Sequence, residues 1–212
     1  MKIFLIVTKE YDQNCYCCFD PDNREGVLID PGLNEEGIFA FLEEAKIIVK
    51  AILFTHGHYD HIMSAEKVRA HTSAPILAHS AETELLYDPY INLSGLMARK
   101  RCSLTIDKPL EEGDEIKFGQ YALRVIYTPG HTAGGICYYS EPQKVIFTGD
   151  TMFWESVGRT DLPQGDGQTL THSINEKLLT LPKETIVYPG HGRPTDIGHE
   201  ILIHSRVNMF EF

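Results

Sequence analysis

The chain has 212 residues, 42% of them hydrophobic and 23% charged, so it can bury a substantial core and has the composition of a folded protein. The formal net charge of −11 disfavours binding to nucleic acid and to acidic membrane surfaces. An anionic substrate is still compatible with this charge, because bound divalent cations can reverse its sign locally. No apolar run has the length of a membrane span or of a signal-peptide core, so we expect one cytoplasmic domain over residues 1–212.

The first third of the chain begins with predicted strands at Lys2–Thr8, Asn14–Phe19 and Gly26–Ile29, separated by turn-forming clusters. Asn34 stands where a helix N-cap is expected, with acidic residues directly after it. The helix that follows has four apolar residues on one face: Ile38, Phe41, Leu42 and Ala45.

The rest of the chain alternates in the same way. Helices are predicted from Ser64 to about His71 and over Gln168–Leu181, and residues 80–100 are expected to be partly helical. The simplest prediction for Tyr87–Lys100 is a surface helix, with a lid or a partner-binding face as alternatives. Residues 156–167 are expected to form a loop. Because strand pairs are interleaved with helices, the pattern predicts two sheets covered by helices. Further strands are predicted at Lys50–Thr55, Pro75–Ala78, Tyr121–Thr128, Ile136–Tyr139, Val145–Thr148 and Thr185–Tyr188.

The five cysteines do not indicate a disulfide framework or a metal site. Their number is odd, and Cys15, Cys17 and Cys18 fall within one predicted strand. The Cys-x-Cys-Cys run also lacks a second pair of cysteines that could complete a zinc site. We therefore expect reduced thiols that pack as small hydrophobic side chains, and this includes Cys102 and Cys137.

Histidine and aspartate side chains gather directly after the ends of four predicted strands. Loops at strand ends are where functional residues concentrate, so we expect these side chains to meet at one rim of the fold. By composition, the pattern His-x-His-x-Asp-His would arise roughly once in a thousand such chains, which makes it a specific signal. The residues are His56, His58, Asp60 and His61 in one loop, followed by His131, Asp150 and His191 after three other strands.

These residue types predict a site for two divalent metal ions. Imidazole and carboxylate suit Zn²⁺, which is the first candidate, and also Fe and Mn²⁺. In an extended loop His56 and His58 point to one side, whereas Asp60 and His61 lie on the next bend and can face a second ion. Asp150 has two oxygens and can bridge both ions. Ions about 3.5–4 Å apart can share a nucleophilic hydroxide, so Asp60 and Asp150 are the candidate catalytic residues.

Four ordered motifs, at residues 55–61, 129–132, 148–151 and 188–191, together with Asp30 after an early strand, resemble those of the metallo-β-lactamase superfamily. Residues 134–139 and 156–161 resemble its glyoxalase II-like branch, in particular short bacterial proteins similar to hydroxyacylglutathione hydrolase. The resemblance implies an αββα sandwich with the metals at one edge, and hydrolysis of a small-molecule acyl thioester such as S-D-lactoylglutathione. It implies one ion on His56, His58 and His131, a second on Asp60, His61 and His191, and Asp150 between them.

The sequence departs from long glyoxalase II enzymes after the last motif. Only 21 residues follow His191, so we expect no counterpart of the helical domain whose basic residues hold glutathione in those enzymes, and Gly192–Thr195 stands where they have a substrate-binding tyrosine. Whether glutathione is the thiol therefore stays open. Arg159 and Arg193 are candidate substrate-binding residues, because guanidinium binds carboxylates in a bidentate manner. An ion pair with Asp161 is an equally good prediction for Arg159.

Other functions use a similar site. A mononuclear iron persulfide dioxygenase shares the metal loop and a Gly-Arg-Thr-Asp run like residues 158–161, but the context of His191 favours the hydrolase. A lactonase or a β-lactamase would direct the same water at a ring, and the glyoxalase-like flanks disfavour the β-lactamase. A nuclease would need an added domain and a basic groove. A metal-binding module without catalysis is disfavoured, because structural zinc sites are usually closed. The sequence leaves the metal, the substrate and the oligomeric state open.

Overall fold

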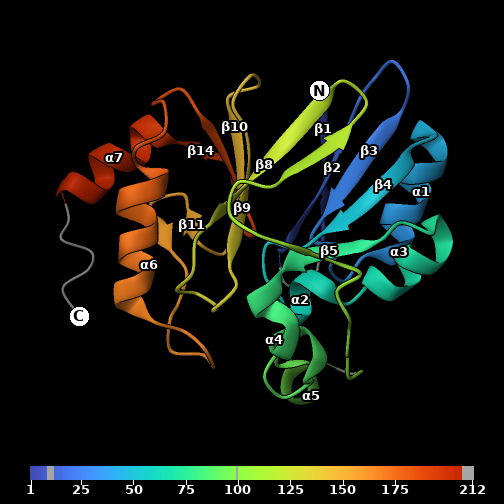
Figure 1. Cartoon of the computed structure of the whole chain (residues 1–212), viewed down its shortest axis with the longest axis horizontal. Helices are drawn as coiled ribbons and strands as arrows, with labels where there is room; N and C mark the ends of the chain where they lie inside the picture. The colour runs from blue at the N-terminus through green and yellow to red at the C-terminus, as the bar shows by residue number, and fades with distance from the viewer. Residues whose placement is uncertain (9–11, 99, 207–212) are drawn as a thin grey trace.

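The computed structural model describes residues 1–8, 12–98 and 100–206. Two six-stranded sheets pack face to face, and helices cover their outer faces (Figure 1). This architecture confirms the predicted αββα sandwich. The strand order, which periodicity did not provide, is β1-β2-β3-β4-β5-β6 in the first sheet and β14-β13-β10-β9-β8-β7 in the second.

The first sheet begins with an antiparallel hairpin and continues as parallel strands. β1, β2 and β3 are antiparallel neighbours, and β3 to β6 run parallel. Helices α1 (Glu35–Ala45) and α3 (Ala65–Thr72) form the crossovers between parallel strands, and the side chain of Asn34 accepts a bond from Gly37 N at the start of α1, as predicted. The carboxyl ends of β3, β4 and β5 therefore share one edge. The strands are β1 (Lys2–Val7), β2 (Asn14–Phe19), β3 (Glu25–Ile29), β4 (Ile48–Leu53), β5 (Ile76–His79) and β6 (Lys108–Leu110).

The second sheet is an antiparallel meander with one parallel strand added. β7 to β10 are antiparallel neighbours, β13 runs parallel to β10, and β14 pairs with β13. Helix α6 (Gly167–Ser173) and a π-helical turn (Ile174–Leu178) connect β10 to β13, and α7 (Ile197–Arg206) follows β14. The carboxyl ends of β8, β10 and β13 thus share one edge. The strands are β7 (Glu115–Phe118), β8 (Tyr121–Tyr127), β9 (Ile136–Ser140), β10 (Val145–Gly149), β13 (Ile186–Pro189) and β14 (Thr195–Asp196).

The cores lie between the two sheets and beneath the helices, and β2 is buried on both faces. Tyr16 and Cys18 belong to the cluster between the sheets, whereas Cys15 and Cys17 belong to the cluster beneath α1 and α3. The cysteines are unpaired, and burial raises the pKa of the Cys17 thiol to about 12. These features confirm the prediction of reduced, packed thiols.

Two segments differ from the sequence-based predictions. The expected loop at residues 156–167 begins with β12 (Ser156–Val157), which pairs with β11 (Met152–Phe153) in a hairpin too short to show alternation. Residues 80–100 are partly helical, as expected, but α4 (Thr83–Tyr87) and α5 (Ser94–Met97) replace a continuous surface helix over Tyr87–Lys100. Among the described residues, no helix combines the length and the apolar character needed to cross a bilayer.

Candidate metal centre

The edge where the parallel strands of both sheets end carries all seven predicted metal-site residues. After β4 the chain bends at Thr55 and continues to His58, the extended N-cap of the short helix α2 (Tyr59–Ile62), which holds Asp60 and His61. From the second sheet, β8, β10 and β13 are followed by His131, Asp150 and His191. Segments that are distant in sequence therefore converge because their strands point the same way.

The seven side chains form two groups that share Asp150. In the first, the ligand atoms of His56, His58 and His131 all lie within 4.8 Å of one another. The second group, Asp60, His61 and His191, is equally compact, and His191 Nε2 lies 3.2 Å from Asp60 Oδ2. Asp150 Oδ2 is 3.7 Å from His131 Nε2 and 3.6 Å from His191 Nε2. One carboxylate thus faces both groups.

Contacts at the rear of three imidazole rings, those of His56, His61 and His131, direct their Nε2 atoms toward the centre, whereas His58 turns its Nδ1 toward His131 Nε2, 2.9 Å away. Asp30 accepts a bond from Thr55 Oγ1 at 2.6 Å, so Thr55 Oγ1 is free to accept the proton of His56 Nδ1 at 3.1 Å. Asp30 also faces His61 Nδ1 at 3.0 Å, and the carbonyl of Arg159 accepts from His131 Nδ1 at 2.7 Å. A proton held on Nδ1 leaves Nε2 as the atom that can bind a metal ion once it carries no proton, the arrangement typical of metal-binding histidines.

Electrostatic surroundings differ between the two groups. Burial lowers the pKa of His58 to about 3 and holds that of His56 well below its ordinary value, so both rings are neutral and can donate lone pairs. Burial also opposes protonation of His61, but Asp150 and Asp60 raise the pKa of His61 well above its ordinary value. Despite burial, His61 in turn holds the pKa of both carboxyls below the usual range. Two ionised carboxylates thus surround His61, and a metal cation bound there would take the place of its proton.

The donor set fits divalent metal ions. His56 Nε2 is buried and has no hydrogen-bond partner among the described residues, although it points into a cluster of polar atoms. A buried polar atom without a partner is rare, and a metal ion would complete its interactions. Imidazole nitrogens with carboxylate oxygens are ligands that Zn²⁺, Fe and Mn²⁺ all accept, so the chemistry of the donors does not select one metal.

The backbone of Gly190 lies very close to two of the predicted ligands, Asp150 and His61. A Cβ on Gly190 would collide with Asp150 Oδ1 and with the ring of His61. The loop after β13 can therefore approach the other ligands only because this residue has no side chain. The Pro-Gly-His pattern at residues 189–191 thus serves to place His191.

Glu82 supports the centre but was not identified from the sequence. It is fully buried in the short 3₁₀ turn η1 (Ser80–Glu82), and burial raises the pKa of its carboxyl. Its carboxylate accepts bonds from Gly57 N at 2.8 Å, Gly134 N at 2.7 Å and Thr132 Oγ1 at 2.6 Å. It thus joins the loop containing His56 and His58 to the loop containing His131. The only sequence signal is one glutamate in an irregular segment.

Asn14 performs a similar task for the loop after β13. Its side-chain amide donates to Pro189 O at 3.0 Å and to Gly192 O at 2.9 Å, on either side of His191. Tyr16 Oη also donates to Pro189 O, at 2.7 Å. The start of β2 in the first sheet therefore holds a ligand loop of the second sheet, a contact that strand patterning does not reveal.

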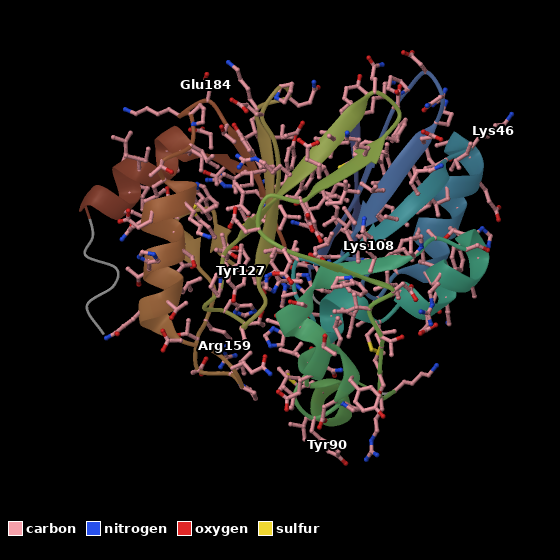
Figure 2. The ribbon with its side chains drawn as sticks, viewed as in Figure 1. Lys46, Tyr90, Lys108, Tyr127, Arg159 and Glu184 are labelled. Carbon is pink, nitrogen blue, oxygen red and sulfur yellow. The ribbon has the colours of Figure 1, made fainter. Side chains whose placement is uncertain are left out.

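The two predicted substrate-binding arginines have different surroundings. Arg159, which Figure 2 labels, is exposed and forms a bidentate ion pair with Asp161, with both N···O distances at 2.7 Å. The structural role that the sequence also allowed is therefore the one observed. Arg193 instead stacks its guanidinium on the Trp154 ring, 3.4 Å from the ring centroid. Substrate binding by either residue stays a prediction.

Comparisons with known proteins agree with this geometry. Residues 9–191 match the family model described as the metallo-beta-lactamase superfamily. The hydroxyacylglutathione hydrolase GloC of Haemophilus influenzae is 34% identical over 206 residues, covering 94% of this chain and 95% of the relative. The structure of BLEG-1 B3 metallo-beta-lactamase has a TM-score of 0.89 and 36% identity, covering 94% of this chain and 96% of that one. The di-iron-bound form of TTHA1623 has a TM-score of 0.82 and 34% identity, with coverages of 93% and 96%.

Proposed function

Because this chain belongs to the metallo-beta-lactamase superfamily, we propose that it is a two-metal hydrolase of acyl thioesters such as S-D-lactoylglutathione. The observation that carries the proposal is the pair of three-residue ligand groups, each compact and each within reach of Asp150. The similarity to GloC supports the thioester class. The similarity to a di-iron form of TTHA1623 supports leaving iron beside zinc as a candidate metal.

In this proposal His56, His58 and His131 would hold one ion and Asp60, His61 and His191 would hold the other, with Asp150 between the two groups. Ions bound there would supply a hydroxide at neutral pH and polarise the thioester carbonyl. Asp30 keeps His61 and, through Thr55, His56 in the tautomers that bind metal. The substrate reaches the centre beside His191, whose side chain is 28% exposed, whereas those of His56 and His61 are enclosed.

Metal analysis combined with a thioesterase assay tests the proposal. Purified protein loaded with Zn²⁺, Fe²⁺ or Mn²⁺ is expected to bind two ions per chain and to hydrolyse S-D-lactoylglutathione. Asp60→Ala removes a ligand of the second ion, so it should lower the metal content toward one ion and reduce kcat at least about 100-fold. Asp22→Ala, an exposed carboxylate in the β2–β3 turn, is the matched control and should change neither quantity. Full activity in Asp60→Ala would exclude the two-metal mechanism.

The similarity to BLEG-1 favours a β-lactamase as the second candidate, because it extends over nearly the whole chain at 36% identity. A substrate panel separates the alternatives: the thioester, a lactone, a cephalosporin, and glutathione persulfide in an oxygen electrode. Cephalosporin turnover with no thioester turnover would replace the proposal with a β-lactamase. Oxygen consumption with the persulfide would replace it with an oxidoreductase.

A further inference from the structure

We propose that Arg193, stacked on Trp154, is a carboxylate-binding subsite that holds the thiol half of an anionic thioester beside the metal centre. The inference rests on the proposed thioesterase function. It adds that the enzyme recognises the thiol half of its substrate. It starts from a pocket of about 400 Å³ lined by Phe153, Trp154, Ser156, His191, Gly192 and Arg193.

The pocket opens directly onto the second group of ligands. His191 lines it, and the ring centroid of Phe153 lies 6.2 Å from that of His191. The side chain of His191 is 28% exposed, compared with 16% for Asp60 and 14% for Asp150. A thioester whose carbonyl lies at the metal centre can therefore extend one of its halves into this pocket.

Arg193 is suited to bind a carboxylate there. Its Cζ lies over the Trp154 ring, 3.4 Å from the centroid, and a guanidinium held over a ring face can still present its N–H groups for a bidentate contact. Within the described part of the chain, no ion pair joins Arg193 to a carboxylate, whereas Arg159 is already paired with Asp161. A cation beside aromatic rings matches a ligand that carries a carboxylate.

The buried carboxylate of Glu200 bonds to both segments that form the pocket, the one that carries Trp154 and the one that carries Arg193. Glu200 in α7 is fully buried, and it accepts bonds from Glu155 N at 3.2 Å and from Thr195 Oγ1 at 2.6 Å. Glu155 directly follows Trp154, and Thr195 lies two residues after Arg193. The hairpin turn that carries Trp154 and the loop that carries Arg193 are therefore held to the same helix, so the stacked pair is in place before a ligand arrives.

The size of the pocket indicates the thiol half rather than the acyl half. A three-carbon hydroxyacyl group fills only a fraction of about 400 Å³, whereas a peptide-sized thiol such as glutathione fills more of it and carries carboxylates. The subsite would therefore discriminate between thioesters of the same acyl group according to the charge of the thiol.

Fluorescence measures occupation of this pocket directly, because Trp154 is the only tryptophan of the chain. The metal-loaded protein is titrated with glutathione and, in parallel, with the uncharged thiol N-acetylcysteamine. Glutathione is expected to change the emission with saturation, and Arg193→Ala should weaken its apparent affinity about tenfold, the effect of losing one charge-assisted contact. N-acetylcysteamine should bind wild type and variant equally weakly.

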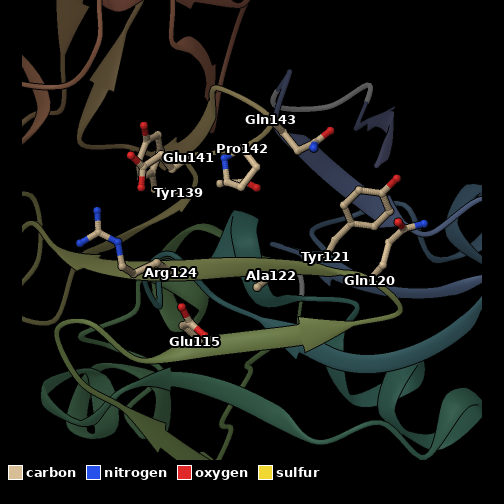
Figure 3. A pocket seen from close by; sticks show the side chains of 10 residues that line it. Glu115, Gln120, Tyr121, Ala122, Arg124, Tyr139, Glu141, Pro142 and Gln143 are labelled. Carbon is tan, nitrogen blue, oxygen red and sulfur yellow. The ribbon is translucent and has the colours of Figure 1, made fainter.

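Arg124→Ala provides the matched control. Arg124 also stacks on an aromatic ring, 5.7 Å from the centroid of Tyr139, and it lines a groove of about 480 Å³ with Glu115 and Glu141 (Figure 3). This groove lies at the start of β8, the end opposite to His131. Arg124→Ala should keep the wild-type glutathione affinity, whereas equal weakening in both arginine variants would overturn the subsite.

Kinetics separates failure of the subsite from failure of the proposed function. Arg193→Ala should raise KM for S-D-lactoylglutathione about tenfold and leave KM for the lactoyl thioester of N-acetylcysteamine unchanged. An unchanged KM for the charged substrate, or an equal rise for both, would overturn the inference alone. If wild type hydrolyses neither thioester, the proposed function fails, and the glutathione titration still decides whether Arg193 binds a carboxylate.

Discussion

Asp30 contacts two of the proposed ligands, His61 directly and His56 through Thr55. It bonds to Thr55 N at 2.8 Å and to Thr55 Oγ1, and it faces His61 Nδ1. Its own backbone is left-handed, with φ 51°, a conformation that aspartate and asparagine adopt more readily than most residues. The residue is thus suited both to the sharp turn after β3 and to orienting the imidazoles.

Asp30→Asn is expected to weaken retention of the metal ions about 10–100-fold. Asparagine keeps the shape and the backbone conformation, but its amide is a poorer acceptor for both Thr55 Oγ1 and His61 Nδ1. Competition with a chromophoric chelator measures the change. Asp12→Asn, an exposed residue with a similar φ of 49°, is the matched control. Equal retention by both variants would show that the charge of Asp30 does not support the site.

Glu82→Ala is expected to lower the free energy of unfolding by about 3 kcal/mol. The substitution leaves the amides of Gly57 and Gly134 and the hydroxyl of Thr132 buried without their acceptor. Urea denaturation of the metal-free protein measures this loss without any contribution from bound ions. The exposed neighbour Glu84 provides the control, since Glu84→Ala should change stability by no more than about 0.5 kcal/mol. Similar stability of the two variants would refute the role of Glu82 in joining the loops.

At the scale of the element, helix α1 shows how far local sequence determines structure. Asn34 and the acidic first turn predicted its start, and the structure confirms that cap. Its end was not predicted, because the residue in the left-handed position is Lys46, with φ 55°, and not the usual glycine. Figure 2 shows Lys46 pointing into solvent at the end of this helix.

Lys46→Gly is therefore expected to stabilise the protein by about 0.5–1 kcal/mol. Glycine adopts the left-handed conformation without the steric penalty of a Cβ, and the exposed lysine side chain has little packing to lose. Thermal and urea unfolding measure the gain. Glu44→Gly, two residues earlier and inside the helix, should have the opposite effect, a loss of about 1 kcal/mol. Destabilisation by both substitutions would mean that the side chain of Lys46 contributes more than its exposure indicates.

At the scale of the whole molecule, the candidate metal centre lies at one edge of the sandwich, where strands of both sheets end. The clusters between the sheets and beneath the helices consist of apolar side chains and do not include the ligands. The fold should therefore persist without metal, in contrast to small domains that zinc alone holds together. A single domain over residues 1–212 and a cytoplasmic location stay predictions from the sequence.

Removing the ions is expected to lower Tm by about 5–10 °C while the circular dichroism spectrum stays that of a folded protein. The shift follows from ions that bind only the native state, at a concentration about 100 times their dissociation constant. Differential scanning calorimetry before and after dialysis against a chelator measures it. His131→Ala should show a smaller shift, because one group of ligands is incomplete. An unfolded metal-free chain would instead indicate a structural metal site.

The sequence by itself determined the features that depend on near neighbours in the chain: the strand at β8, the cap at Asn34, and the residue types placed after successive strands. Periodicity and capping act over a few residues, so they are visible without a fold. Only the tertiary structure decided the strand order, the link from Glu82 between two ligand loops, and the stacking of Arg193 on Trp154. These features join residues far apart in sequence, and their energy arises only when the sheets pack and exclude water.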